Sequence, residues 1–137
     1  MDVGGQSPCP QEARAHLTIY SETKSAEELA DALGLAPRQL WNNGDPNKRD
    51  RPYTTTAISY ESALPPEASP DIHLADLVTQ VAPLATRIRA EVEIGNIVRL
   101  KLAVFEDTDN LMFTLPAGLL ADLGVLGIDL EFDIYCV

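Results

Sequence analysis

Three carboxylates alternate near the end of the chain, at Asp129, Glu131 and Asp133. On an extended strand these side chains share one face at intervals of roughly 7 Å, with the apolar residues between them on the other face. Such a row could bind a hard cation or raise the pKa values of its own members. It could instead lie in water and pair with Arg99 and Lys101 on another strand, and we expect this solvated ladder.

A second group of polar residues alternates near the start of the chain. His16 shares the outward face of a predicted strand with Thr18 and Tyr20. A histidine, a tyrosine and carboxylates on one open sheet face could form a small-ligand site or a general acid–base pair. A partly hydrated sheet surface is the commoner arrangement, and we favour it. His73, near the start of a predicted helix, is expected at the surface.

Aromatic and basic residues meet once in the chain, where Trp41 precedes Lys48, Arg49 and Arg51. A nucleic-acid base could stack on Trp41 while the cations hold phosphates. The formal net charge of -11 weakens any such contact, because the whole molecule repels phosphate at long range. Contact with a partner protein is favoured, since Trp and Arg are enriched at the energetic centres of interfaces.

Motifs of nucleophilic or phosphate chemistry are absent from the sequence. It has no Gly-x-Ser-x-Gly elbow, no glycine-rich phosphate loop, and neither Cys9 nor Cys136 has a catalytic or metal-binding neighbourhood. We therefore predict no catalytic residue, no metal and no cofactor. The sequence has no apolar run long enough for a membrane span, and it does not begin with the basic segment and apolar stretch of a secretory signal. The expected location is therefore the cytoplasm. The oligomeric state is left open.

The 137 residues suffice for one core, so we expect a flexible tail over residues 1–14 and a single domain over 15–137. Ser25 and Glu28 form a capping box for a helix that ends at Gly34. A polar loop follows over 38–52, and Pro83 is expected to kink the second helical region after Pro70. The predicted strands are 15–21, 53–61, 97–105, 111–115 and 128–136, with a third helix over 116–123.

This order of elements predicts an α+β fold. We expect a two-layer sandwich in which a mixed, mainly antiparallel five-stranded sheet carries helices on one face. The strand over 97–105 and the segment Leu111–Leu115 are expected to form a hairpin around the turn Asp107–Asn110.

Four features in this order resemble one known family. They are the first strand, the segment Leu33-Gly34-Leu35 with Pro37, the pair Gly44-Asp45, and the terminal segment from Leu130 to Cys136 that contains Asp133-Ile134-Tyr135. The chain from about Ala15 onward resembles the bacterial domain of unknown function numbered 4279 (DUF4279). The resemblance implies a small bacterial cytosolic domain, and it carries over no activity, cofactor or catalytic residue.

Two hypotheses of function follow. The first is a non-enzymatic module that binds another protein, for example an immunity-type inhibitor whose carboxylates cover the basic active site of a toxin. The second is a small-molecule-binding or catalytic domain that uses the polar sheet face or the Trp41 loop. It requires a cavity in which His16, Tyr20 and the terminal carboxylates converge. A purely structural or oligomerising domain is a third possibility. No nucleic-acid or membrane partner is expected.

Overall fold

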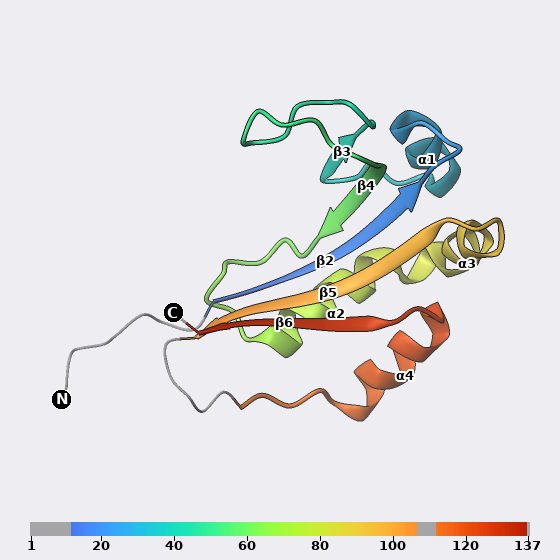
Figure 1. Ribbon diagram of the computed structural model, residues 1–137. Coiled ribbons are helices and arrows are strands. Elements are labelled where there is room, and N and C mark those ends of the chain that lie inside the picture. The colour runs from blue at the N-terminus through green and yellow to red at the C-terminus, as the bar shows by residue number, and fades with distance from the viewer. Residues whose placement is uncertain (1–11, 107–111, 137) are drawn as a thin grey trace.

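The computed structural model describes residues 12–106 and 112–136. Five strands and a layer of helices make up this part of the chain (Figure 1). In chain order the elements are β2 (Glu12–Ser21), α1 (Ala26–Leu33), β3 (Gln39–Trp41), β4 (Thr56–Glu61), α2 (Pro70–Val81), the 3-10 turn η1 (Ala82–Leu84), α3 (Ala85–Glu93), β5 (Ile97–Glu106), α4 (Ala117–Leu126) and β6 (Leu130–Cys136).

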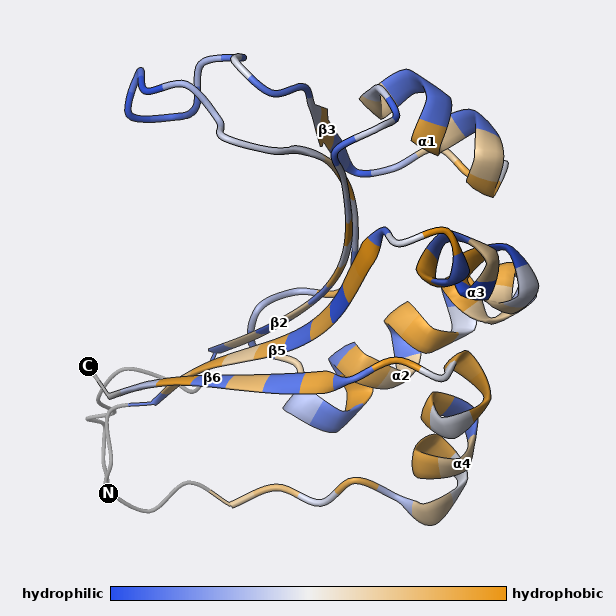
Figure 2. Cartoon of the chain, turned by 45° about the vertical axis from the view of Figure 1, so that its right-hand side comes forward, coloured by the Kyte–Doolittle hydropathy of each residue, from blue (hydrophilic) through white to orange (hydrophobic). Residues whose placement is uncertain are grey.

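The strands form one mixed sheet in the order β3-β4-β2-β5-β6. β2 lies at its centre and pairs antiparallel with both β4 and β5, and β3 pairs antiparallel with β4. Only β6 runs parallel to its neighbour β5. Figure 2 shows the helices on one side of this sheet and the loop between β3 and β4 projecting on the other. The expected two-layer α+β sandwich with a mainly antiparallel five-stranded sheet is confirmed.

The expected hairpin after β5 is wrong. Residues 112–115 form no strand, and β6 joins β5 in parallel after the chain has crossed over through α4. A parallel pair needs a long crossover, which the helix supplies, whereas a hairpin joins antiparallel strands. The fifth strand is β3, a three-residue segment inside what the sequence indicated as loop. The turn expected at 107–110 and residue 111 lie outside the described residues.

Local signals in the sequence account for most of the other boundaries. Ser25 Oγ accepts a hydrogen bond from the backbone amide of Glu28, and the Glu28 carboxylate accepts one from the backbone amide of Ser25. These two bonds are the predicted capping box at the start of α1. Gly34 ends that helix in the left-handed conformation, with φ 74°. The helical region after Pro70 breaks at η1, which contains Pro83. β2 begins at Glu12, three residues earlier than the alternation indicated.

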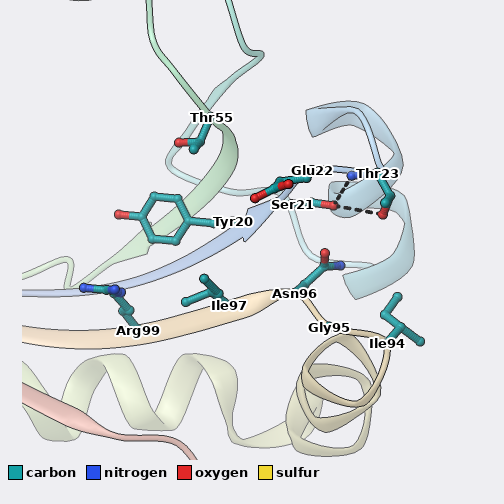
Figure 3. Close-up of a pocket in the computed structure, with 10 residues that line it drawn as sticks. All are labelled: Tyr20, Ser21, Glu22, Thr23, Thr55, Ile94, Gly95, Asn96, Ile97 and Arg99. Carbon is teal, nitrogen blue, oxygen red and sulfur yellow. Dashed lines mark hydrogen bonds between the residues drawn. The ribbon is translucent and has the colours of Figure 1, made fainter.

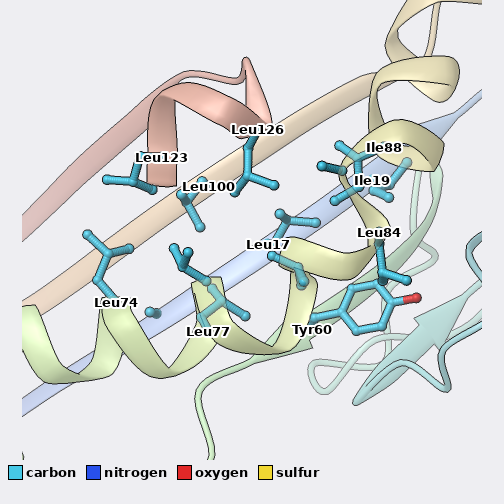
Figure 4. Packing of buried hydrophobic residues seen from close by; sticks show 14 of the residues in the cluster. Leu17, Ile19, Tyr60, Leu74, Leu77, Leu84, Ile88, Leu100, Leu123 and Leu126 are labelled. Carbon is cyan, nitrogen blue, oxygen red and sulfur yellow. The ribbon is translucent and has the colours of Figure 1, made fainter. Parts of the chain in front are cut away.

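The core lies between the sheet and the helices (Figure 4). Leu17 and Ile19 of β2 and Leu100 of β5 are fully buried beneath α2, α3 and α4. The helices contribute residues such as Leu77 and Leu126, which are also buried. Each such side chain stabilises the fold by roughly 1.5–3 kcal/mol relative to its exposure in water. Because alternate residues of β2 and β5 enter this core, the residues between them must lie on the opposite, uncovered face.

No helix in the described parts of the chain is long and apolar enough to cross a membrane.

Candidate binding site

The uncovered side of the sheet, here called the open face, is arranged in rows that cross the strands. The row at one end comprises Trp41, Ala57, Tyr20 and Ile97, and it is aromatic or apolar. The next row carries the hydroxyl and amide side chains of Gln39, Ser59 and Thr18 beside Arg99. The third contains the ionisable residues Glu61, His16, Lys101 and Glu131. The open face therefore changes from apolar to charged along β2.

A cavity of about 310 Å³, here called the central cavity, lies over β2, β5 and β6 on this face. It is lined by Arg14, His16, Thr18, Tyr20, Arg99, Lys101, Ala103, Phe105, Asp133 and Tyr135. These residues come from β2, β5 and β6, so neighbouring strands form its floor. His16, Tyr20 and Asp133 thus meet at a single cavity. The convergence that the second hypothesis requires is present in part, because Glu131 and Asp129 do not line this cavity.

The terminal carboxylates are paired with cations of the adjacent strand. Arg99 Nη1 lies 3.3 Å from Glu131 Oε2, and Lys101 Nζ lies 3.8 Å from Asp133 Oδ2. All four side chains are substantially exposed to solvent, so each pair contributes at most about 1 kcal/mol. Tyr135 donates a hydrogen bond to Asp133 Oδ2 at 2.6 Å, which raises the pKa of the phenol. Asp129 is exposed and precedes β6. The row is a solvated ladder, as expected.

His16 lies at the centre of the charged row. Its Nδ1 is 3.4 Å from Glu61 Oε2, across the β2–β4 pair. Burial lowers the pKa of His16 from its ordinary value of 6.5. The Glu61 carboxylate opposes this shift, whereas Arg14 and Lys101 add to it. His16 is therefore neutral at pH 7 and can accept a hydrogen bond or a proton.

A further cavity of about 370 Å³, here called the loop cavity, adjoins the end of β4. It shares Arg14 with the central cavity, and Arg38 and Lys48 also line it. Its one lining carboxylate among the described residues is Glu61. Arg14, Arg38 and Lys48 have no ion-pair partner in the described parts of the chain. Unpaired positive charge therefore concentrates where the central and loop cavities meet.

A third cavity, about 470 Å³ and larger than the other two, lies at the opposite end of β2 and is here called the isoleucine cavity. Ile94 and Ile97 line it, together with Tyr20 and Arg99, which also line the central cavity (Figure 3). The three cavities consequently adjoin one another along β2, and we call them together the trough. From Tyr20 to Arg14 the strand advances six residues, or about 20 Å.

Trp41 marks the edge of the open face at β3. Its ring stacks on Tyr53 at a centroid distance of 4.7 Å, so the side chain is folded against its own loop. The indole Nε1 is buried and has no hydrogen-bond partner in the described part of the chain. Of the basic loop residues predicted with it, Lys48 lines the loop cavity, whereas Arg49 and Arg51 are exposed and line none of the three cavities.

The sequence interpretation missed several features of this region. His73, expected at the surface, is buried, and its Nδ1 lies 2.7 Å from Ser62 Oγ while its Nε2 lies 2.9 Å from the Pro65 carbonyl oxygen. These bonds fix the segment after β4 that carries part of the loop cavity. Arg14 and Arg38 were also missed. The alternation along β2 could have indicated Arg14, which lies two residues before His16.

Comparison with known proteins adds one finding to this geometry. No curated protein and no solved structure matches the chain. The family model described as Domain of unknown function (DUF4279) matches residues 11–137, which is essentially the whole chain. The resemblance seen in the first strand, the Leu33-Gly34-Leu35 segment and the terminal strand is thereby confirmed, and the chain belongs to the DUF4279 family.

Proposed function

We propose that the protein is a non-enzymatic binding module whose trough holds an extended, acidic segment of a partner protein. The observation that carries this proposal is the positive charge of Arg14, Arg38 and Lys48 beside an uncovered sheet face, in a chain whose net charge is -11. None of these three cations has an ion-pair partner among the described residues. Complementary charge fixes the register of a partner and excludes wrong ones. An extended segment of about six residues spans 20 Å.

This proposal reverses the charge of the expected partner. In the immunity-type version, Asp129, Glu131 and Asp133 would cover a basic active site. Glu131 and Asp133 are already engaged with Arg99 and Lys101, so they would have to leave these partners to bind a toxin. Arg14, Arg38 and Lys48 have no such competitor among the described residues. An acidic partner therefore suits this surface better than a basic one.

Charge reversal inside and outside the trough tests the proposal. The probe is a fluorescein-labelled, glutamate-rich peptide of about eight residues, followed by anisotropy at fixed ionic strength. Arg14→Glu should weaken binding about tenfold, because it removes an unpaired cation and adds a repelling carboxylate. Arg51→Glu makes the same change of net charge outside the three cavities and should weaken binding less than about twofold.

Two outcomes would contradict the proposal. Equal losses in Arg14→Glu and Arg51→Glu would mean that only net charge matters and that the trough is no site. Tighter binding of a lysine-rich peptide of the same length would mean that the partner is basic. Both variants change exposed side chains, so matching thermal unfolding curves should show that neither loses its fold.

A second candidate is a site for a small anionic molecule in the central cavity. It is favoured by three cations, Arg14, Arg99 and Lys101, that line a cavity of about 310 Å³ together with His16 and Tyr20. This volume lies in the range of small-molecule sites. Under this reading, citrate or inorganic phosphate should raise the midpoint of thermal unfolding in the wild type and not in Arg14→Glu. No shift with either anion, alongside binding of the acidic peptide, would leave the protein partner as the better proposal.

A further inference from the structure

The isoleucine cavity differs in chemistry from the rest of the trough. Ile94 and Ile97 line it and remain 60% and 53% exposed. Ile97 and Tyr20 belong to the apolar end row of the open face. Figure 3 shows Tyr20 of β2 beside Ile97 and Arg99 of β5. An apolar surface inside a cavity gains free energy when an apolar group displaces its water.

The charge at this cavity is nearly balanced. Its charged lining residues among those described are Glu22 and Arg99. Arg99 is already paired with Glu131, so its guanidinium is partly neutralised. A carboxylate placed here would meet Glu22 and gain little from Arg99. The occupant is therefore uncharged, in contrast to the group that suits Arg14 and Lys48 at the other end of the trough.

The walls of the cavity are held in place before anything binds. Ser21 Oγ accepts the backbone amides of Thr23 and Lys24, which fixes the turn after β2. Lys24 Nζ contacts the buried Glu91 carboxylate at 3.0 Å, and Asn96 Nδ2 donates to Glu91 Oε1 at 2.8 Å. This network joins the turn after β2 to the turn before β5. A preformed wall lowers the conformational entropy that binding must overcome.

We infer that the isoleucine cavity receives a bulky apolar side chain, of the leucine or phenylalanine class, at one end of the acidic partner segment. This inference rests on the proposed function, because Tyr20 and Arg99 make the cavity continuous with the central cavity. His16 lies four residues, or about 13 Å, from Tyr20 along β2. The partner therefore carries its apolar anchor about four to six residues from the acidic residues that face His16 and Arg14.

Paired peptides and paired variants test this inference. The probes are labelled glutamate-rich peptides. Two of them carry a single Phe, one at the N-terminal end and the other at the C-terminal end, and two matched peptides carry Ser in place of that Phe. For the wild type, Phe at one end should tighten binding about tenfold relative to Ser. The variant Ile94→Ser with Ile97→Thr should lose this gain, whereas Ile72→Ser, on α2 and 52% exposed, should retain it.

The outcomes separate this inference from the proposed function. Equal binding of the Phe and Ser peptides at both ends, or a gain that survives in the double variant, overturns the apolar anchor while the acidic-segment proposal stands. Absence of binding by every acidic peptide overturns both. The substituted isoleucines are exposed and Thr keeps the β-branch at position 97, so unchanged unfolding curves are expected for all variants.

Discussion

The ionisation of His16 depends on three charged residues from three strands. Glu61 on β4 favours its protonated form, whereas Arg14 on β2 and Lys101 on β5 oppose it. Burial is the largest influence and also favours the neutral ring, so the pKa of His16 is lowered. His16 is thus an uncharged acceptor between cations at pH 7, and its protonation would increase the positive charge of the trough.

The lowered pKa predicts a pH dependence of stability. As pH falls below about 6.5, the unfolded chain takes up a proton at His16 before the folded chain does. The contribution of neutral His16 is therefore complete above about pH 6.5 and is lost as pH falls through its folded pKa. Urea unfolding of the wild type and His16→Gln at matched pH values should give free energies whose difference changes in this window. A constant difference would contradict the lowered pKa.

At the scale of elements, β4 is tied to the segment between α1 and β3 by Tyr60. The ring is part of the core (Figure 4). Its hydroxyl donates a hydrogen bond to the Leu35 carbonyl oxygen at 2.7 Å. Burial raises the pKa of Tyr60 to about 12. The bond holds the chain just before Arg38, and so it helps to place one cation of the loop cavity.

Removal of this hydroxyl should destabilise the protein. Tyr60→Phe keeps the ring in the core and leaves the Leu35 carbonyl without its donor, so we expect a loss of about 1 kcal/mol in the free energy of unfolding. Tyr20→Phe is the matched control, because Tyr20 has no side-chain hydrogen bond in the described part of the chain and should change stability by less than about 0.5 kcal/mol. Denaturant unfolding measures both values. Equal losses would contradict the role assigned to the Tyr60 bond.

The sequence predicted those elements whose signals are local. The alternation of Ala15, Leu17 and Ile19, the capping box and Pro83 all depend on neighbours within a few residues, and each produced the expected element. β3 was missed because a strand of three residues, two of them exposed, shows no alternation and lies among turn-forming residues. Its pairing with β4 is a tertiary contact.

The wrong hairpin has a similar cause. The apolar residues near Phe113 suit a strand, and a turn-rich segment precedes them. The helix over Ala117–Leu126 was the better indication of how β6 pairs with β5, because a helix between two strands favours a parallel crossover. For the site, alternation placed His16, Tyr20 and the carboxylates on the open face. Alternation could not indicate Arg38, because this residue directly precedes β3 and reaches the trough only through the pairing of β3 with β4.

For the molecule as a whole, the positive charge is unevenly distributed. Seven of the ten Lys and Arg residues lie on the open face, beside β3 or in the loop after it, namely Arg14, Arg38, Lys48, Arg49, Arg51, Arg99 and Lys101. The other three contact the helical layer: Lys24 pairs with Glu91, and Arg87 and Arg89 donate to backbone carbonyls. An acidic ligand therefore meets repulsion from the molecule at a distance and attraction only near the trough.

This arrangement predicts an unusual response to salt. At about 0.01 M salt the screening length is about 30 Å, so an acidic peptide is repelled by the whole net charge, whereas at about 0.1 M it is about 10 Å. The association rate constant of the acidic peptide should therefore rise several-fold between these concentrations. Stopped-flow fluorescence measures the rate, with an uncharged peptide as control. A rate that falls with salt would show that the positive face dominates even at long range.

The stacking of Trp41 on Tyr53 also means that the intrinsic fluorescence of the protein can report on binding. Trp41 is the single tryptophan of the chain, so the intrinsic fluorescence excited near the red edge of absorption comes from one indole, which lies on the edge strand β3 of the open face. A partner that separates the two rings, or that offers an acceptor to the enclosed Nε1, changes the polarity around that indole and hence the colour of its emission. Occupancy can thus be followed in unlabelled protein.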